Sequence, residues 1–362
     1  MIRTGKKLVS ACCAAIAICL QSLGQPLVGA AQSAETHMSD PEPVILVNSK
    51  LPIPEEGNVV YCSTFSLAWS ELNRSSGSNV RLEGDPGVVT LLNEFPASVS
   101  DLPNGTFVVD AGLFREHIVG HIDEALIKAF PSSHLQCPVR EGRPEEALAF
   151  ALLKHSLPFS EPFLPMQISF GGKTGVRLPA FGLPKEVSTE DFNRLRGQIR
   201  VWRYAAPDSF TLLLVPKQDA EEILLARLPR RPTGSLDAIL STVLEQQLPP
   251  PAPLAHGEPV AVPVLSVAVR YHFAELEGRK IISGRLVGQS IDKALQWIDF
   301  DMNETGATVE SGAIIKTLGS LAQSAGRAFL FDGPFVLILR KVGRAPYFVL
   351  LITDPQALRA KG

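Results

Sequence analysis

Acidic and amide side chains recur at alternate positions in the stretch DFDMNETGATVESGA, which covers residues 299–313. Asp299, Asp301 and Asn303 carry oxygen ligands of the type that calcium prefers, and Glu310 follows eleven positions after the first of them. An EF-hand calcium loop has ligands at comparable positions and a glutamate at its twelfth residue. Two interpretations follow: a calcium-binding loop, or the end of a strand that continues into an exposed segment.

The position of glycine decides between these two interpretations. An EF-hand loop needs glycine at its sixth position, where the backbone makes a sharp turn with positive φ. Glu304 occupies that position here, and the first glycine, Gly306, comes two residues later. Such loops also generally work in pairs, and no second loop accompanies this one. The pattern therefore favours a strand end and a loop hinge over a calcium site.

The remaining residues that could support catalysis or metal binding do not form a known motif. His117 and His121 stand four residues apart without an acidic partner in a metalloprotease pattern, so we interpret them as surface or core histidines. The stretch GGKTG at residues 171–175 matches neither a P-loop nor a dinucleotide-binding motif and is interpreted as a turn. The sequence predicts no enzyme, no metal and no cofactor.

Two pairs of adjacent carboxylates were considered as acid and base groups. Glu145 and Glu146 form one pair, and Glu221 and Glu222 form the other. Both pairs fall in stretches that we expect to be helical and exposed, where carboxylates are normally solvated. We therefore predict that neither pair is catalytic.

The N-terminus has the pattern of a secretory signal peptide. Three basic residues precede the apolar run LVSACCAAIAICL, which is too short to span a bilayer. Small residues follow, and VGA at residues 28–30 is the predicted cleavage site, with Ala34 as an alternative. We therefore predict an exported protein, secreted or periplasmic, with a signal peptide over residues 1–30, a flexible leader over 31–50 and a single domain over 51–362.

Composition and charge exclude several classes of partner. The 362 residues are 45% hydrophobic and 20% charged, which is typical of a globular chain with a large core. The net charge is -3 and no basic patch stands out, so nucleic acid is not expected as a partner, and no stable membrane insertion is expected. Cys62 and Cys137 remain after the signal peptide, and whether they pair cannot be deduced from the sequence.

Strands and helices are expected to alternate irregularly along the chain. The Pro-rich stretch at residues 246–259 predicts a long surface connection, and residues 147–159 are apolar enough for a central strand or a buried helix. The other expected elements are helices that start at Ser63, over 122–130 and near Ser235, and strands within 105–114, 198–217, 260–273, 334–341 and 346–355. This order favours an α+β fold with large antiparallel or mixed sheets.

The residues after Gly306 have a pattern that suits a strand able to enter a sheet. With a period of two, Ala307, Val309, Ser311 and Ala313 fall on one uncharged face, and no proline interrupts the chain before residue 333. Such a segment keeps every backbone donor and can bury one face. An ordinary strand or helix with a small-residue face explains the pattern equally well.

Several stretches resemble the serpins, protease inhibitors that trap their target by inserting a cleaved loop into a central sheet. DKALQWIDFDMNETGA at 292–307 is similar to the strand that leads into the loop hinge. FLFDGPFVLILRK and APYFVLLITDP within 329–355 are similar to the closing strands, and NVVYCSTFSLAWSEL at 58–72 to a helix entered through Ser63 and Ser66. Between AFPSSHL and ALAFALL the chain is shorter than the family pattern, which has a further strand and helix there.

The resemblance implies a fold, a partner and a mechanism. The fold is a large central mixed sheet with two smaller sheets, surrounding helices and an exposed reactive loop. The function is inhibition of a serine or cysteine protease by a monomer that acts as a suicide substrate. A non-inhibitory serpin-like protein, whose loop is merely cut or whose surface binds a ligand or partner, is the alternative.

The resemblance also assigns roles to individual residues of the loop. The scissile bond is expected within residues 316–324, with Ser320–Leu321 as the specific prediction. The hinge is expected to comprise Glu304, Gly306, Ala307, Thr308, Val309, Ser311 and Ala313.

Overall fold

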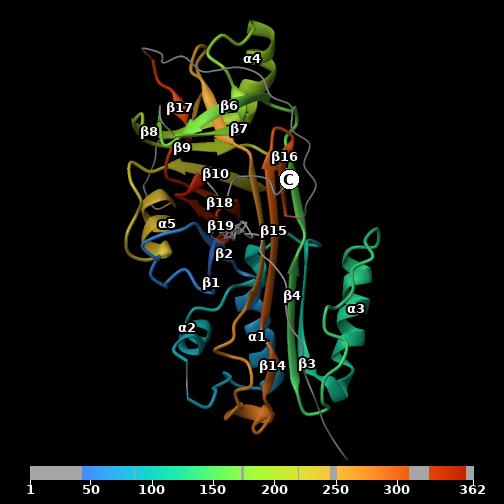
Figure 1. The fold of residues 1–362 in the computed structure, drawn as a ribbon. Coiled ribbons are helices and arrows are strands. Elements are labelled where there is room, and N and C mark those ends of the chain that lie inside the picture. The colour runs from blue at the N-terminus through green and yellow to red at the C-terminus, as the bar shows by residue number, and fades with distance from the viewer. Residues whose placement is uncertain are drawn as a thin grey trace, which may run out of the picture. The chain divides into compact units, whose positions relative to one another are not determined.

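The computed structural model describes residues 43–84, 86–172, 175–218, 220–244, 251–309 and 326–355. The chain divides into two compact units, Met1–Met38 and Ser39–Gly362, and all described residues belong to the second. Their strands form four sheets of eight, four, four and three strands (Figure 1). The predicted α+β class with large mixed sheets is confirmed.

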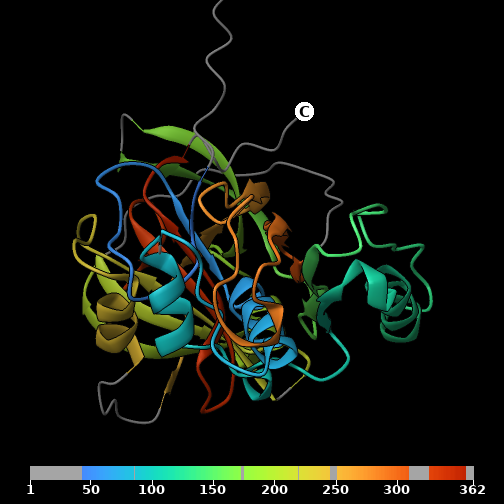
Figure 2. The same cartoon turned by 90° about the horizontal axis from the view of Figure 1, so that it is seen from below.

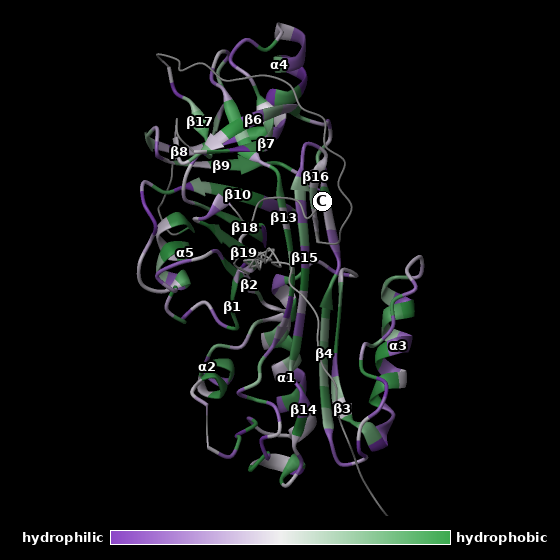
Figure 3. Ribbon diagram, viewed as in Figure 1, coloured by the Kyte–Doolittle hydropathy of each residue, from purple (hydrophilic) through white to green (hydrophobic). Residues whose placement is uncertain are grey.

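The largest sheet has eight strands and includes β19, the last strand that the structure describes. Its order is β1-β2-β19-β18-β10-β9-β8-β11. Figure 3 shows its central strands coloured hydrophobic, as expected for strands that are covered on both faces. The bounds are β1 Val44–Leu46, β2 Val59–Cys62, β8 Ile199–Ala206, β9 Ser209–Leu214, β10 Glu221–Arg227, β11 Ala252–Pro253, β18 Phe335–Lys341 and β19 Pro346–Ile352.

Strand β1 lies within the stretch that the sequence assigned to a flexible leader. It pairs in parallel with β2, and Ile45 and Leu46 are buried. The apolar run in PVILV is only a few residues long and follows a polar stretch, so the sequence carried little indication of a strand. Residues of β1 before the predicted domain start at residue 51 therefore belong to the eight-stranded sheet.

A four-stranded sheet in the order β17-β12-β7-β6 packs with α4 nearby (Figure 1). Its strands are β6 Leu164–Phe170, β7 Val176–Leu183, β12 Val260–Pro263 and β17 Phe329–Leu330, and α4 is Thr189–Leu195. Phenylalanine rings from β6, β7 and the preceding loop join its inner face to the main core.

Two smaller sheets contain the predicted hinge and its neighbours. One has the order β13-β15-β16-β5 and the other the order β14-β4-β3. They are continuous through the chain, since only Lys154 separates β4 from β5 and only Ala294 separates β14 from β15. The bounds are β3 Phe107–Leu113, β4 Ala147–Leu153, β5 His155–Pro158, β13 Leu265–His272, β14 Ile291–Lys293, β15 Leu295–Asn303 and β16 Gly306–Val309. The apolar stretch at 147–159 is thus strand, not helix.

Five α-helices lie in the described part of the chain. They are α1 Thr64–Ser76, α2 Val88–Glu94, α3 Ile118–Ala129, α4 and α5 Leu236–Leu244, with short 3-10 turns at Val99–Asp101, Phe114–Glu116, Arg196–Gln198 and Gly284–Leu286. Helix α1 starts where predicted, with Ser63 at its N-cap position, but the Ser63 hydroxyl makes no capping hydrogen bond. Helix α3 starts four residues earlier than predicted and packs against β3, as Figures 1 and 2 show from two directions.

The apolar residues gather in three clusters that follow the sheets. The main cluster joins α1 to the inner faces of β15, β18 and the four-stranded sheet. A second lies between α5 and the other face of the eight-stranded sheet, and a third lies between α3, β3 and β4. Within the described ranges, no helix has the length and apolar character needed to cross a bilayer.

Candidate functional site

The predicted hinge residues form a strand inside a sheet. β16 is antiparallel to both of its neighbours, with Ala307 opposite Met302 of β15 on one side and Leu157 of β5 on the other. These three side chains are almost fully buried. Thr308 faces the opposite side, where its hydroxyl lies 3.4 Å from that of Ser156. Ala307 thus points to the core and Thr308 away from it, as expected for successive positions of a strand.

A tight two-residue turn joins β15 to β16. The amide and hydroxyl of Thr305 donate to Oδ1 of Asn303 at 2.8 and 2.7 Å. The backbone carbonyls of the turn also accept hydrogen bonds. The amide of Phe159 donates to the carbonyl oxygen of Thr305, and the amide of Phe163 to that of Glu304, at 2.9 Å each. The turn is therefore fixed to the segment that follows β5, and it sets the starting point of β16.

Gly306 is required by its surroundings as well as by its backbone angle. Its φ is +148°, and a Cβ atom there would lie 2.5 Å from the carbonyl oxygen of Leu157 and 2.6 Å from Cα of Pro158. Both neighbours are backbone atoms, which cannot move aside as a flexible side chain can. A side chain at this position would separate β16 from β5.

A buried polar cluster lies next to the hinge strand. Nε2 of His155, on β5, lies 2.8 Å from Oε2 of Glu221 at the start of β10, and the hydroxyl of Tyr347 on β19 donates to the same carboxylate at 2.8 Å. Burial, and then the charge of Glu221, raise the pKa of Tyr347 well above its usual value. Because His155 is also paired with Val309 between β5 and β16, the cluster connects β16 to the eight-stranded sheet.

Three of the four paired carboxylates differ from the sequence prediction, whereas Glu145 is exposed as expected. Glu221 and Glu222 are buried in a strand, not solvated on a helix, and the second of them pairs with Arg340 at 2.6 Å. Glu146 is also buried and accepts hydrogen bonds from the amide and guanidinium of Arg143. Periodicity alone failed here because each carboxylate is compensated by a partner that is distant in sequence or lies in a turn.

Directly beyond β16, the two smaller sheets contain a place that no described strand occupies. At one end β14 pairs with β4, where Lys293 is opposite Leu148, and at the other end β15 pairs with β16 from residue 301 onward. Between these ends, residues 149–153 of β4 and 295–300 of β15 have no strand partner on their facing edges among the described residues. We call this region the strand gap.

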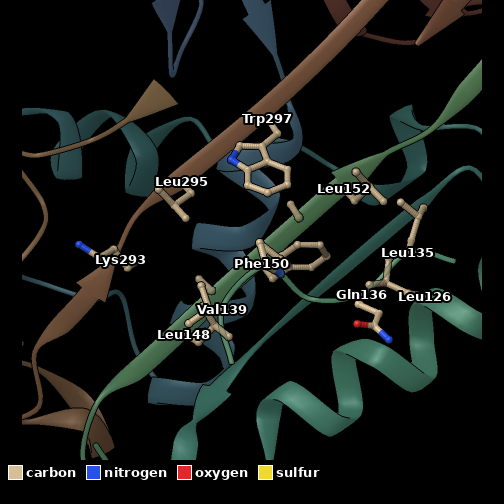
Figure 4. Close-up of a pocket in the computed structure, with 13 residues that line it drawn as sticks. Leu126, Leu135, Gln136, Val139, Leu148, Phe150, Leu152, Lys293, Leu295 and Trp297 are labelled. Atoms are coloured by element: carbon tan, nitrogen blue, oxygen red, sulfur yellow. The ribbon is translucent and has the colours of Figure 1, made fainter. Parts of the chain in front are cut away.

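A pocket of about 60 Å³ opens at the strand gap on the side of α3. Figure 4 shows Leu295 and Trp297 of β15 on one side of it and Phe150 of β4 on the other. Leu126 of α3 and the segment that follows this helix close the pocket from outside. The lining is almost wholly apolar, and the indole of Trp297 is 43% exposed. An apolar surface with open backbone edges on both sides is suited to an extended peptide chain.

The predicted site residues divide into three groups. Glu304 lies in the turn and Gly306, Ala307, Thr308 and Val309 form β16, so the structure brings this part of the predicted hinge together. Ser311, Ala313, Ser320 and Leu321 lie outside the described residues.

The residues considered for calcium form a strand. Asp299, Asp301 and Asn303 all belong to β15, so they do not form the loop that an EF-hand requires. Asp299 instead pairs with Arg270 of β13 at 2.6 Å. The interpretation of these residues as the end of a strand is confirmed, and the hinge that was expected to follow it remains a prediction.

Sequence analysis missed the cluster of His155, Glu221 and Tyr347 and the exposed Trp297. The first three come from separate strands, and only the topology brings them together. For Trp297 the sequence did carry a signal, because it places a tryptophan at an outward-facing position of a predicted strand. Cys62 and Cys137, whose pairing was left open, are separate buried thiols.

Comparisons with known proteins concern the fold. The chain matches no protein-family model and no curated protein sequence. Among solved structures it matches Serpin48, a highly specific serpin of the insect Tenebrio molitor, at 13% identity, with 83% of this chain and 92% of that chain covered and a TM-score of 0.46. Human thyroxine-binding globulin matches at 12% identity, with 82% and 92% covered and a TM-score of 0.43. The mouse protein-Z dependent protease inhibitor matches at 14% identity, with 83% and 92% covered and a TM-score of 0.47.

These solved structures are serpins, which is the family that the sequence resembles. The chain is therefore similar to a divergent serpin in fold. At these identities and TM-scores the likeness is limited to the fold and carries no statement about activity.

Proposed function

We propose that this protein is an exported serpin-like inhibitor that acts as a suicide substrate for a serine or cysteine protease. The single observation that carries the proposal is the position of β16. Four residues of the predicted hinge already lie between β5 and β15, and the strand gap lies directly ahead of them in the chain direction. A strand has begun in this sheet, and no residue that the structure describes occupies the place of its continuation.

Cleavage of the loop would release the chain to continue along the gap. Each added residue would gain backbone hydrogen bonds to a strand, and residues on the Ala307 face would be buried against the core. The intact chain withholds this stabilisation because both ends of the loop are fixed, by β16 on one side and by β17 on the other. This is the general logic of a strained loop whose cleavage releases stored free energy.

Insertion would inhibit the protease through its covalent intermediate. After attack on the predicted Ser320–Leu321 bond, the protease stays attached to the new carboxyl end as an acyl-enzyme. If the strand enters the sheet before water completes hydrolysis, the protease is carried along and its oxyanion hole is distorted. The inhibitor itself performs no turnover, needs no cofactor and works as a monomer.

The test is cleavage followed by a measurement of stability. The purified chain is cut with a subtilisin-type or elastase-type protease, and mass spectrometry identifies the bond. A cut within residues 316–324 that raises the melting temperature supports the proposal. A cut there that leaves the melting temperature unchanged or lowers it would contradict insertion and favour the non-inhibitory alternative.

One observation favours that alternative. The pairing of β14 with β4 closes the far end of the strand gap at Lys293 and Leu148. A loop that enters only as far as this closed end would move an attached protease over a shorter distance than a loop that opens the whole sheet. In that case the loop would be a substrate, and covalent complex would not accumulate.

A further inference from the structure

A second pocket, of about 260 Å³, lies on the eight-stranded sheet at the end of α5. Its floor is a row across three strands, because Arg203 of β8 is paired with Thr211 of β9, which is paired with Ala226 of β10. Directly paired residues of an antiparallel sheet point to the same face, so these side chains form one surface. Thr242 and Val243, in the last turn of α5, line the side of the helix. We call this cavity the α5 pocket.

The small side chain of Ala226 helps to create the α5 pocket. Ala226 belongs to the apolar cluster between α5 and the sheet, where its neighbours on the same face include Leu224 of β10 and Val336 of β18. Those two positions carry branched side chains, whereas Ala226 carries a single methyl group. A larger residue here would fill part of the space between the sheet and the end of the helix.

The lining of the α5 pocket carries positive charge and no carboxylate. Arg203 and Arg227 both line it, and no lining residue is acidic. Arg227 is held in place, because its Nη2 lies 3.2 Å from Asp332 and its Nη1 donates to the carbonyl oxygen of Pro334 at 3.1 Å. Arg203 is half-buried, and among the described residues no carboxylate forms an ion pair with it. Its guanidinium is therefore available to an anion.

Hydroxyl groups and apolar carbon complete the lining. The hydroxyls belong to Ser209, Thr211 and Thr242. Thr242 donates its hydroxyl proton to the carbonyl oxygen of Ala238 at 2.9 Å, which leaves the oxygen free to accept a hydrogen bond. Leu228 contributes apolar surface beside them. A guanidinium, several hydroxyls and an apolar wall are complementary to a ligand with an oxyanion, hydroxyl groups and a carbon skeleton.

We propose that the α5 pocket binds a small organic anion that carries a phosphate or carboxylate group and several hydroxyl groups. The planar guanidinium of Arg203 binds two oxygens of the anionic group at once, and Thr211, next to it on the floor, binds a ligand hydroxyl. Ligand pockets usually measure roughly 300–1,000 Å³, so this cavity suits a molecule of the size of one sugar phosphate. The inference is independent of the proposed function, because the α5 pocket shares no residue with β16 or the strand gap.

Isothermal titration calorimetry of the purified full-length chain tests the chemical class of the ligand. The probes are glucose 6-phosphate and gluconate, which are hydroxylated anions, with inorganic phosphate and glucose as controls that each lack one of the two features. We expect at least one hydroxylated anion to bind about tenfold or more tightly than either control. Failure of both hydroxylated anions to bind, or an equal affinity for inorganic phosphate, would overturn the proposal.

A matched pair of arginine variants tests the place of binding. Arg203→Gln should weaken binding of the hydroxylated anion by about tenfold or more, because the charged fork is lost. Arg200→Gln removes the same charge from the same strand, but Arg200 does not line the pocket, so its affinity should equal that of the wild type. Equal losses in the two variants would show a general attraction of anions to this strand, which would contradict a site at Arg203.

Thr211→Val tests the hydroxyl with little change of shape. We expect its affinity for the hydroxylated anion to fall several-fold, while its melting temperature without ligand shows that the chain is folded. Arg203→Lys, which keeps the charge but not the planar fork, should bind with an affinity between those of Arg203→Gln and the wild type. An unchanged affinity in folded Thr211→Val would contradict the contact with this hydroxyl, and an unchanged affinity in Arg203→Gln would place the ligand elsewhere.

Discussion

Ala307 of β16 lies directly opposite Met302 of β15, and the two side chains are 2% and 0% exposed. Residues 306–309 of the predicted hinge thus already lie in a sheet. Under the proposed mechanism, the cleaved loop would continue an existing strand, which avoids the cost of starting a new one. The following predictions derive from this arrangement.

An arginine on the buried face of β16 should expel the strand. Ala307→Arg would place an unpaired cation in the core, which costs roughly 2–5 kcal/mol and would be relieved by detachment of β16. We expect faster hydrogen exchange at the amides of residues 306–309 and loss of the melting-temperature rise after cleavage. Thr308→Arg, on the other face of the same strand, is the control and should change neither property. Equal effects of the two variants would contradict the assigned faces.

A methyl group at Gly306 should disrupt the contact between β16 and β5. Gly306→Ala would bring its Cβ within 2.5 Å of the carbonyl oxygen of Leu157. Gly343 also has a positive φ, of +70°, but has open space around it, so Gly343→Ala should lose only about 1 kcal/mol from backbone strain. Urea denaturation should show a clearly larger loss for Gly306→Ala. Similar losses at the two sites would mean that the steric contact with β5 is not maintained.

Removal of the Tyr347 hydroxyl should change stability at neutral and alkaline pH in different ways. Tyr347→Phe leaves the buried Glu221 without one hydrogen-bond donor, and we expect a loss of about 1–3 kcal/mol at pH 7. Because burial raises the pKa of Tyr347, folding favours its neutral form, and wild-type stability falls as pH rises above the unfolded value near 10. The variant lacks this group, so its stability should fall less steeply above pH 10. Denaturation curves that decline in parallel would contradict the assignment.

Acid should weaken the segment that leads into β4. Hydrogen bonds from the amide and side chain of Arg143 lower the pKa of Glu146 below its usual value of 4.5. Stability from this group is present above that value and is lost as pH falls through the lower folded pKa. Glu146→Gln should therefore be less stable at pH 7 and should lose less stability on acidification. If the stability of the variant falls below pH 4.5 as steeply as that of the wild type, other carboxylates are responsible for the acid sensitivity.

Sequence reasoning succeeded where one local pattern dominates. The apolar runs at β18 and β19, the strands within residues 198–217 and the helix after Ser63 were all predicted near their observed positions. These elements follow from periodicity and turn chemistry, which are properties of neighbouring residues. The hinge was predicted from a family pattern, and of its residues Ala307 lies on the buried face of β16, as the strand pattern predicted.

The rest depends on contacts between distant residues. Glu221 was predicted to be solvated because the sequence around it gives no sign of its contacts with His155 and Tyr347. Those contacts arise only from the sheet topology. Strand β1 was missed because three residues carry too little pattern, and it is stabilised by pairing with β2. The strand gap could not be predicted at all, because it results from where two strand pairings end.

The most direct test of the central claim is covalent trapping of a protease. The purified chain is incubated with a panel of serine and cysteine proteases that includes elastase-like and subtilisin-like enzymes, and the products are separated on denaturing gels. The account predicts an SDS-resistant complex with at least one protease, formed by the wild type and by Thr308→Arg but converted to simple cleavage in Ala307→Arg. Cleavage of the loop by every active protease in the panel without any resistant complex would contradict it.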